Sequence, residues 1–172
     1  MKYKLTDETI EYSGHILHRI ECVKPFGEVK EGYKGGYIEK EDNLSQYGNA
    51  WVYGNAWVYG NAEVYGDAEV YGNAMVYGNA KVFGNARVHD NAEVCDDAEV
   101  CDDADYIVFK NNWSSGRYFT WTRSNDMWKV GCFYGTGKEL IEKAYKDSET
   151  SGKHYESYVN FIEQLKQLDI NN

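Results

Sequence analysis

The sequence predicts a mainly β protein whose centre is a parallel β-helix. A six-residue unit, x-Val-Tyr-Gly-Asn-Ala, runs without a gap from Tyr47 to Tyr106, and a fixed short period indicates a solenoid. Before this repeat, residues 2–22 form two strand-like runs; after it, further strand-like runs give way to residues at helical spacing. We therefore divide the chain into an N-terminal β-hairpin (1–28), a β-helix (29–106, with clear hexads at 47–106) and a C-terminal α+β module (107–172).

Each position of the hexad has a geometric role. In the x-Val-Tyr triplet, Val points to one side of the strand and its two neighbours point to the other. A narrow core accepts Val and, at the corners, Ala, but it has no room for stacked Tyr. Gly-Asn or Gly-Asp pairs form the turns because Gly and Asn tolerate positive φ best. The Val and Ala columns are therefore predicted to be buried, and the x and Tyr columns to face outward.

This repeat resembles the hexapeptide-repeat left-handed β-helix, in which three hexads form one triangular coil. The resemblance implies that residues eighteen apart stack on neighbouring coils. It also implies a homotrimer, because hexapeptide-repeat proteins are typically trimers. The complete prediction is a left-handed parallel β-helix of hexapeptide repeats with an N-terminal β-hairpin and a small C-terminal βββαα module.

The variable x position then forms three outward columns. Two of them alternate in charge sign from coil to coil, and we interpret this as specifying register, since exposed pairs contribute only about 0.2–1 kcal/mol each. The columns are Trp51, Glu69, Arg87 and Asp105; Trp57, Met75 and Glu93; and Glu63, Lys81 and Glu99.

The Tyr columns and the tryptophans at the start of the repeat form a large outward aromatic surface. Large apolar patches usually mark contacts. Two interpretations stay open: cover by flanking segments or other subunits, and a groove for a ligand or partner between subunits. The candidate residues on the solenoid are Trp51, Tyr53, Trp57, Tyr59, Tyr71, Tyr77 and Arg87.

Residues 1–46 predict a hairpin that turns at Ser13-Gly14, followed by degenerate hexads that start near Val29. Ile38 and Leu44 fall in the Ala column of the hexad register, so the fit is imperfect. Terminal units of solenoids are usually atypical because they cap an open edge.

After Tyr106, three short antiparallel strands are predicted in YIVFK, RYFTWTR and MWKVGCF, and two helices follow. Thr136 and Glu139 form a capping box for the first helix, and KHYESYVNFIEQLKQL forms the second. Cations and aromatics in this module either stack a base and hold a phosphate or belong to a packed sheet with solvated arginines. These residues are Arg117, Trp121, Arg123 and Trp128.

The net charge of −10 is concentrated in the repeat. Residues 47–106 carry two basic and eleven acidic groups, whereas the flanks together carry sixteen basic and seventeen acidic groups. An acidic surface repels bare nucleic acid and attracts basic protein grooves, so we expect no direct nucleic-acid binding. The most acidic stretch, which we call the acidic belt, consists of Asp90, Glu93, Asp96, Asp97, Glu99, Asp102, Asp103 and Asp105.

The belt also raises the question of a metal ion. Asp90, Asp96 and Asp102 replace corner glycines, and oxygen-rich corners suit Ca²⁺ or Mg²⁺. However, Asp tolerates positive φ, and successive corners of a triangular coil point apart. We therefore assign no metal and no cofactor. Cys95 and Cys101 lie one face apart, beyond the ~7 Å limit of a disulfide, and are predicted to be free thiols.

The cellular compartment is predicted from the hydrophobic segments and the cysteines of the chain. It has no basic and apolar leader and no apolar run near bilayer length, so we expect a soluble protein with no membrane partner. Its four cysteines form no CxxC pair and fit a reducing cytosol.

The order of hairpin, GGYIEKEDNLS, GNAWV repeats and tail resembles uncharacterised proteins encoded in bacteriophage and prophage genomes. The resemblance covers essentially the whole chain and implies the cytoplasm of a bacterial host. We expect a non-enzymatic binding protein that antagonises a host process, above all an immune defence, in the manner of an anti-CRISPR or other anti-defence protein. It would block a host protein or sequester a nucleotide signal between subunits.

An acyltransferase with an acyl-CoA donor is the alternative. Hexapeptide-repeat acyltransferases use a histidine as general base beside a cleft between subunits, often with a loop that interrupts the coils. Here no loop interrupts the hexads, and His89 stands where Tyr stands elsewhere. His89 is therefore a weak candidate base, and we lean towards a protein that is not an enzyme.

Overall fold

The computed structural model describes residues 1–170 and divides the chain into two compact units. The first comprises Met1–Ile107 together with Thr122–Asn125, and it contains both the hairpin and the solenoid. The second comprises Val108–Trp121 and the chain from Asp126 onward. Among residues 1–170, no helix has the length and apolar character needed to cross a bilayer.

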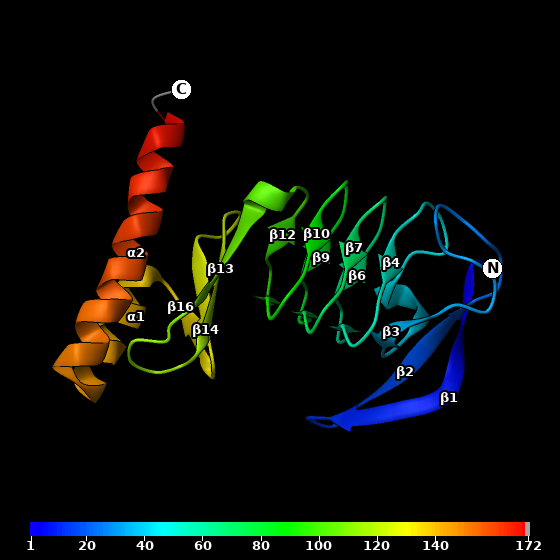
Figure 1. Ribbon diagram of the computed structural model, residues 1–172, viewed down its shortest axis with the longest axis horizontal. Coiled ribbons are helices and arrows are strands. Elements are labelled where there is room, and N and C mark those ends of the chain that lie inside the picture. Colours follow the sequence, from blue (N-terminus) through cyan, green and yellow to red (C-terminus); the bar gives the residue numbers. More distant parts are fainter. Residues whose placement is uncertain (171–172) are drawn as a thin grey trace. The chain divides into compact units, whose positions relative to one another are not determined.

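The repeat forms a β-solenoid whose strands are two residues long (Figure 1). Strands eighteen residues apart pair in parallel, as Glu69 with Arg87 and Glu63 with Lys81 show, which confirms the predicted columns through this part of the repeat. The strands are β4 (Trp51–Val52), β5 (Trp57–Val58), β6 (Glu63–Val64), β7 (Glu69–Val70), β8 (Met75–Val76), β9 (Lys81–Val82), β10 (Arg87–Val88), β11 (Glu93–Val94) and β12 (Glu99–Val100).

The core of the solenoid is the predicted one. The Val and Ala of the hexads are buried from Ala50 and Val52 to Ala98 and Val100, whereas Ala104 in the last hexad is exposed. The corner glycines have positive φ, and Asp90 and Asp96 take their place with φ of 60° and 55°. At Gly48 a side chain is also excluded by space, because a Cβ would lie 2.5 Å from the carbonyl oxygen of Gly66.

The N-terminal hairpin extends one face of the solenoid. Strands β1 (Tyr3–Tyr12) and β2 (His15–Cys22) turn at Ser13-Gly14, as predicted, with both residues at positive φ. Strand β2 pairs antiparallel with β3 (Lys34–Ile38), and β3 pairs in parallel with β5. The resulting sheet has the order β1-β2-β3-β5-β8-β11, so the hairpin and one column of coils form one continuous sheet.

The first coil shows why the early register looks imperfect. Ile38 pairs with Val58 and Leu44 with Val64, and both aliphatic residues are fully buried. These partners are twenty residues apart instead of eighteen, so the first coil holds two extra residues. The placement of Ile38 and Leu44 in the Ala column was therefore wrong: they occupy the Val column. A short 3₁₀ turn, η1 (Glu41–Asn43), lies between them.

Each coil donates its backbone N–H groups to the carbonyls of the next coil, as Trp51 N does to Ala68 O at 3.0 Å. The first coil of regular hexads, which contains β4, β5 and β6, therefore presents carbonyls that no earlier hexad can satisfy. Backbone N–H groups of Tyr37 and Ser45 reach two of these, on Ala56 and Val64, at 3.0 and 2.9 Å. The N-terminal segment thus acts as a backbone cap on part of this edge.

Two buried side chains satisfy other carbonyls of the first coil. The Lys2 ammonium donates to Ala50 O at 2.8 Å, and the Asn43 amide donates to Ala62 O and Gly60 O at 2.8 and 3.2 Å. Both side chains are buried. They replace the N–H groups that a preceding coil would supply.

The last coil presents the opposite group, the backbone N–H. Asp103, Ser124 and Asp105 supply side-chain oxygens that accept, respectively, from the N–H groups of Arg87, Glu99 and Cys101, at 2.9, 2.8 and 2.8 Å. Three residues of the predicted acidic belt, Asp102, Asp103 and Asp105, lie at this edge. Asp102 has a φ of −144° and is not a corner in the left-handed region; its side chain instead caps the 3₁₀ turn η2 (Asp103–Asp105) by accepting from Ala104 N.

The C-terminal region has four strands where three were predicted. They are β13 (Tyr106–Lys110), β14 (Tyr118–Thr122), β15 (Met127–Val130) and β16 (Phe133–Gly135), which pair in that order. The predicted third strand splits because Gly131, with a φ of 55°, turns the chain back so that β15 and β16 pair antiparallel.

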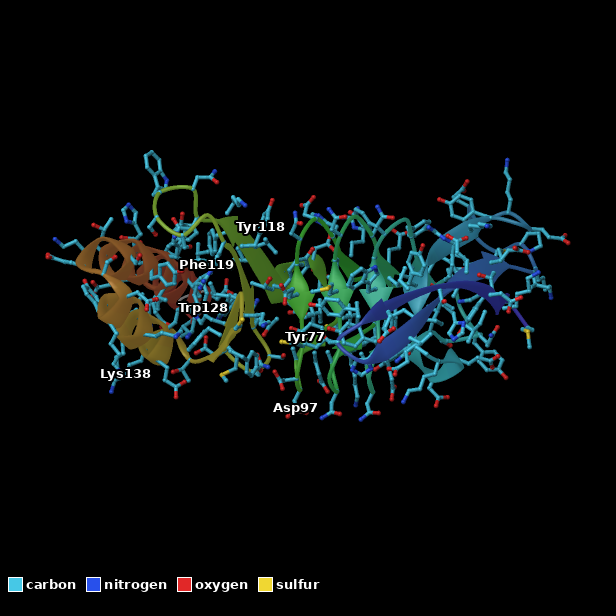
Figure 2. All side chains as sticks on the ribbon, turned by 90° about the horizontal axis from the view of Figure 1, so that it is seen from below. Tyr77, Asp97, Tyr118, Phe119, Trp128 and Lys138 are labelled. Atoms are coloured by element: carbon cyan, nitrogen blue, oxygen red, sulfur yellow. The ribbon has the colours of Figure 1, made fainter. Side chains whose placement is uncertain are left out.

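Two helices follow, α1 (Gly137–Asp147) and α2 (Glu149–Ile170). The predicted capping box is present: Glu139 accepts from Thr136 N at 2.8 Å, and Thr136 accepts from Glu139 N at 3.3 Å. Phe119 and Trp128 lie between the strands and the helices (Figure 2), and the Phe119 ring packs on Tyr155 of α2 at 4.6 Å. The overall class is therefore the predicted one: mainly β, with a hairpin start, a β-solenoid and two C-terminal helices.

Candidate binding surface on the solenoid

Much of the predicted outward aromatic surface is covered by the chain's own N-terminal segment. Trp51 is fully buried, with the rings of Tyr3 and Phe26 at 6.0 and 5.4 Å. Trp57 is half-buried against Tyr12, whose ring centroid is 4.9 Å away. The proposal that Trp51 lines an exposed groove is therefore wrong, since the segment that caps the first coil also encloses this ring.

One Tyr column is covered in the same way. Tyr59 and Tyr77 stack at 5.0 Å, with their ring planes 7° apart, and Tyr59 packs with Leu17 and Tyr37 of the hairpin and β3. Burial raises the pKa of both hydroxyls above their usual value, and nearby Glu93, which accepts from Tyr77, adds to the effect for Tyr77. Tyr59 is part of the core under the hairpin and Tyr77 is partly buried against it, which removes both from the candidate surface.

A second Tyr column stays accessible. It consists of Tyr53, Tyr71 and His89, which directly follow β4, β7 and β10, together with Glu69 in β7 and Arg87 in β10. All five are half-buried or exposed. We call these five residues the Tyr71 surface. The rings of Tyr71 and His89 stack at 5.0 Å, with their planes 16° apart, and Tyr53 donates to Glu69 at 3.3 Å. Burial, together with Glu69, raises the pKa of Tyr53 to about 12, so its hydroxyl remains a donor.

Arg87 joins this surface to the last coil. Its Nε donates to Asp103 at 3.1 Å, and this contact holds the pKa of the Asp103 carboxyl below its usual range. The predicted partner in the column, Asp105, instead accepts from the backbone of Cys101 and Asp102. The column ends one coil early because η2 turns the chain away from the hexad path.

His89 has part of the geometry of a general base. Its Nδ1 lies 2.7 Å from an Asp90 carboxylate oxygen, and its ring makes an edge contact with Tyr106 at 6.2 Å. A carboxylate in this position orients an imidazole, as a base requires. The stack on Tyr71 occupies one face of the ring. The arrangement supplies an oriented imidazole without a second group placed to stabilise a reacting substrate.

The residues of the acidic belt have different structural roles. Asp90 and Asp96 form turns, Asp102, Asp103 and Asp105 satisfy backbone groups at the last coil, and Glu93 accepts from Tyr77. Asp97 accepts from Asn79 at 3.1 Å and lies at an outer corner (Figure 2). Glu99 is exposed and lies 3.9 Å from Lys81. Within residues 1–170, no group of three or more His, Cys, Asp or Glu side chains is arranged to hold a metal ion.

The predicted free thiols are confirmed: Cys95 is buried, Cys101 is exposed, and neither forms a disulfide. Among the C-terminal candidates, Trp121 and Trp128 are buried. The Trp121 indole donates to Asp126 at 2.9 Å. Arg117 and Arg123 are exposed. The packed-sheet interpretation therefore holds for the two tryptophans, which leaves no base-stacking surface on either ring.

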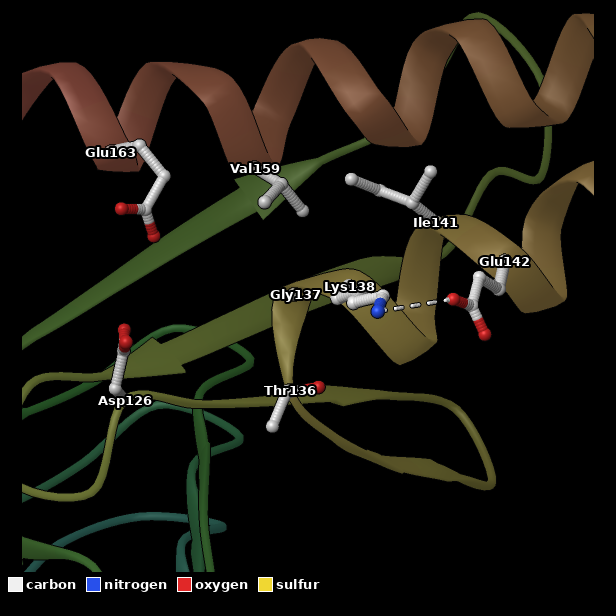
Figure 3. Close-up of a pocket in the computed structure, with 8 residues that line it drawn as sticks. All are labelled: Asp126, Thr136, Gly137, Lys138, Ile141, Glu142, Val159 and Glu163. Carbon is white, nitrogen blue, oxygen red and sulfur yellow. Dashed lines mark ion pairs between the residues drawn. The ribbon is translucent and has the colours of Figure 1, made fainter.

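The second unit contains a pocket of about 420 Å³ between α1 and α2 (Figure 3). Lys138 lies 4.0 Å from Glu142, and Lys166 contacts Asp126 and Glu163 at 2.7 and 2.8 Å. The start of α1, which would attract an anion, already has the Glu139 carboxylate bonded to Thr136. The charged side chains at the pocket are thus paired with other residues of the chain. The residues that line the pocket therefore offer no unsatisfied group that selects a ligand.

Comparison with known proteins supports the class of fold. A family model described as YdcK Beta solenoid repeat matches residues 68–82, a segment that runs from the residue before β7 to the end of β9. No curated protein matches the chain. The stacked coils and this match together define the protein as a β-solenoid repeat protein.

Proposed function

We propose that this protein is a non-enzymatic binding protein whose solenoid presents the Tyr71 surface to a protein partner. The proposal is supported by one observation above all: the Tyr71 surface combines aromatic rings, a guanidinium and a carboxylate on a rigid frame. Tyr and Arg are enriched among the residues that carry binding energy at protein interfaces. Their order is fixed before binding by the stack of Tyr71 on His89 and by the Arg87–Asp103 contact, which lowers the entropic cost of association.

The setting of this function follows from the resemblance to phage-encoded proteins. We propose that the partner is a host protein, above all one of an immune defence, and that binding blocks it. Sequestration of a nucleotide signal between subunits and assembly as a homotrimer stay predictions. Light scattering checks the trimer, whose interface would have to avoid the Tyr59 and Tyr77 column that the hairpin covers.

The solenoid offers a matched pair of variants for the test. Tyr71→Ala/Arg87→Ala removes the centre of the proposed surface. Tyr65→Ala/Lys81→Ala removes the equivalent residues one hexad earlier, where Tyr65 stacks on Phe83 at 5.2 Å on another face. Affinity capture from host lysate, with mass spectrometry, should recover one protein with the wild type and the Tyr65/Lys81 variant but not with the Tyr71/Arg87 variant. Equal recovery by both variants would place binding elsewhere and contradict the proposal.

The acyltransferase alternative rests on the His89–Asp90 pair. Calorimetry with acetyl-CoA separates the two functions. Under the binding proposal, wild-type protein gives no heat of binding at micromolar concentrations. Micromolar affinity that disappears in His89→Ala would support the enzyme and overturn the proposed function.

A further inference from the structure

A second surface lies on the C-terminal unit, at the hairpin between β13 and β14. Trp113 stands there with 77% of its surface exposed. The chain's other four tryptophans are buried or half-buried. An exposed indole is unusual because tryptophans are among the side chains that gain most from burial. Its exposure leaves the face of the ring available to a ligand.

The loop that carries Trp113 is held by a buried asparagine. Asn111 is fully buried; its amide donates to Ser114 at 2.7 Å and its side-chain oxygen accepts from Trp113 N at 3.2 Å. Its backbone carbonyl and N–H bond to Gly116 and Arg117 at 2.8 and 2.9 Å. The indole is therefore presented by an ordered loop in which little conformational entropy is left to lose on binding.

Two cations lie in the same hairpin as the exposed ring, Lys110 at the end of β13 and Arg117 just before β14. Arg117 closes the same loop, and the Lys110 ammonium lies 4.1 Å from the centre of the Tyr118 ring. Residues 108–121 and 126–135 contain three basic groups and one acidic group, Asp126, which pairs with Lys166. The charge of this region is thus opposite in sign to the −10 of the whole chain. The general expectation that an acidic protein avoids nucleic acid does not apply to a region with this local charge.

We propose that this hairpin binds short single-stranded nucleic acid, with one base stacked on Trp113 and neighbouring phosphates held by Arg117 and Lys110. A single strand fits because its bases are free to stack on an exposed ring, which a duplex does not allow. Charge complementarity selects the phosphate backbone. One ring and two cations provide contacts for only a few nucleotides, so the site suits short segments. The Trp113 hairpin belongs to a different unit from the Tyr71 surface. The proposal of nucleic-acid binding and the proposed function are therefore tested independently.

The test uses the full chain and a fluorescently labelled twelve-residue oligothymidylate, followed by anisotropy at low and moderate salt. Trp113→Ala should weaken binding by roughly tenfold or more, as expected for one lost base stack. Arg117→Ala should reduce the dependence of log K on log salt by roughly 0.7, as expected for one lost phosphate contact. Tyr47→Ala is the matched control, because Tyr47 is 85% exposed but lies in the acidic repeat; its affinity should equal that of the wild type.

Three results would overturn the proposal. One is the absence of binding by the wild type at protein concentrations up to roughly 100 μM, the weak end of the range of non-specific dissociation constants. A second is equal affinity for an abasic oligomer, which would remove the stacked base from the account. The third is displacement by polyglutamate as effective as displacement by the oligonucleotide, which would assign the surface to an acidic protein partner instead.

Discussion

At the first coil of the solenoid the open edge consists of carbonyl groups, whereas at the last coil it consists of N–H groups. The chain meets these edges with side chains of opposite character: donors from Lys2 and Asn43 at the start, and acceptors from Asp103, Asp105 and Ser124 at the end. The donors are buried, whereas the acceptors are partly or fully exposed. The comparison shows that part of the acidic end of the repeat has a structural cause.

The difference in burial predicts unequal costs when a cap is removed. Water can replace an exposed acceptor but cannot reach a buried carbonyl, so the first edge should be far more sensitive than the last. Four changes test this contrast between the two edges, and they are ordered by the size of the expected effect.

Asn43→Leu should have the largest effect. It leaves the carbonyls of Ala62 and Gly60 without their side-chain donor and removes the acceptor of Lys40 N at 2.9 Å. We expect a loss of about 2–4 kcal/mol in the free energy of unfolding, measured by urea denaturation. Asn49→Leu, at an exposed corner, is the control and should change stability by less than about 0.5 kcal/mol. Equal losses in the two variants would refute the burial argument.

Lys2 predicts a pH dependence. Burial lowers its pKa to about 8, so between pH 8 and the unfolded value near 10.5 the unfolded chain binds more protons than the folded chain. Stability should therefore rise with pH through this window, by roughly 3 kcal/mol at most, at 1.36 kcal/mol per pKa unit. The measurement is the difference between wild-type and Lys2→Met unfolding free energies from pH 7 to 10.5. If the difference in unfolding free energy does not change with pH, burial does not lower the pKa of Lys2.

At the last coil, Asp103→Ala should cost only about 1 kcal/mol, because both the Arg87 N–H and its guanidinium can turn to water. Asp103→Asn retains a side-chain oxygen for the Arg87 N–H and should lose less. Urea denaturation of both variants at pH 7 checks the order. A loss for Asp103→Ala as large as that for Asn43→Leu would remove the distinction between the two edges.

The smallest effect is expected at the outer corners. Asn79 donates to the exposed Asp97 at 3.1 Å, one rung of a polar ladder between coils. Asp97→Ala should change the free energy of unfolding by less than about 0.5 kcal/mol. A larger loss, seen by the same denaturation, would mean that ladders between corners contribute to stability beyond setting the register.

The solenoid could be predicted from the sequence because one six-residue period determines the position of the strands, the position of the turns and the spacing of residues that stack. Val64, Ala68 and their equivalents could be assigned to the core from the hexad alone. Ile38 and Leu44 were assigned to the wrong column because a two-residue offset in the first coil has no periodic signal. The split of the last predicted strand at Gly131 was missed because a single Gly is also compatible with a continuous strand.

The candidate surface was less predictable than the fold. The hexad predicts that Trp51 and Tyr59 leave the coil core, but it does not contain the information that residues 1–28 fold back over them. Trp113 was missed for a related reason: the NNWSSG run was interpreted as a turn, and the ring's exposure depends on Asn111 being buried beneath the loop. In both places a contact between distant segments decides which aromatic residue is available to a partner.

Capping of the last coil by side chains can be measured by amide hydrogen exchange at Arg87, because this N–H has a side-chain carboxylate as its acceptor in place of a following coil. We predict that the Arg87 amide is protected in the wild type, retains protection in Asp103→Asn and loses it in Asp103→Ala. Protection at Glu69, whose N–H bonds to Ala86 O at 2.9 Å, should stay unchanged in all three proteins. An Arg87 amide that exchanges equally in the three proteins would contradict the account of the solenoid's ends.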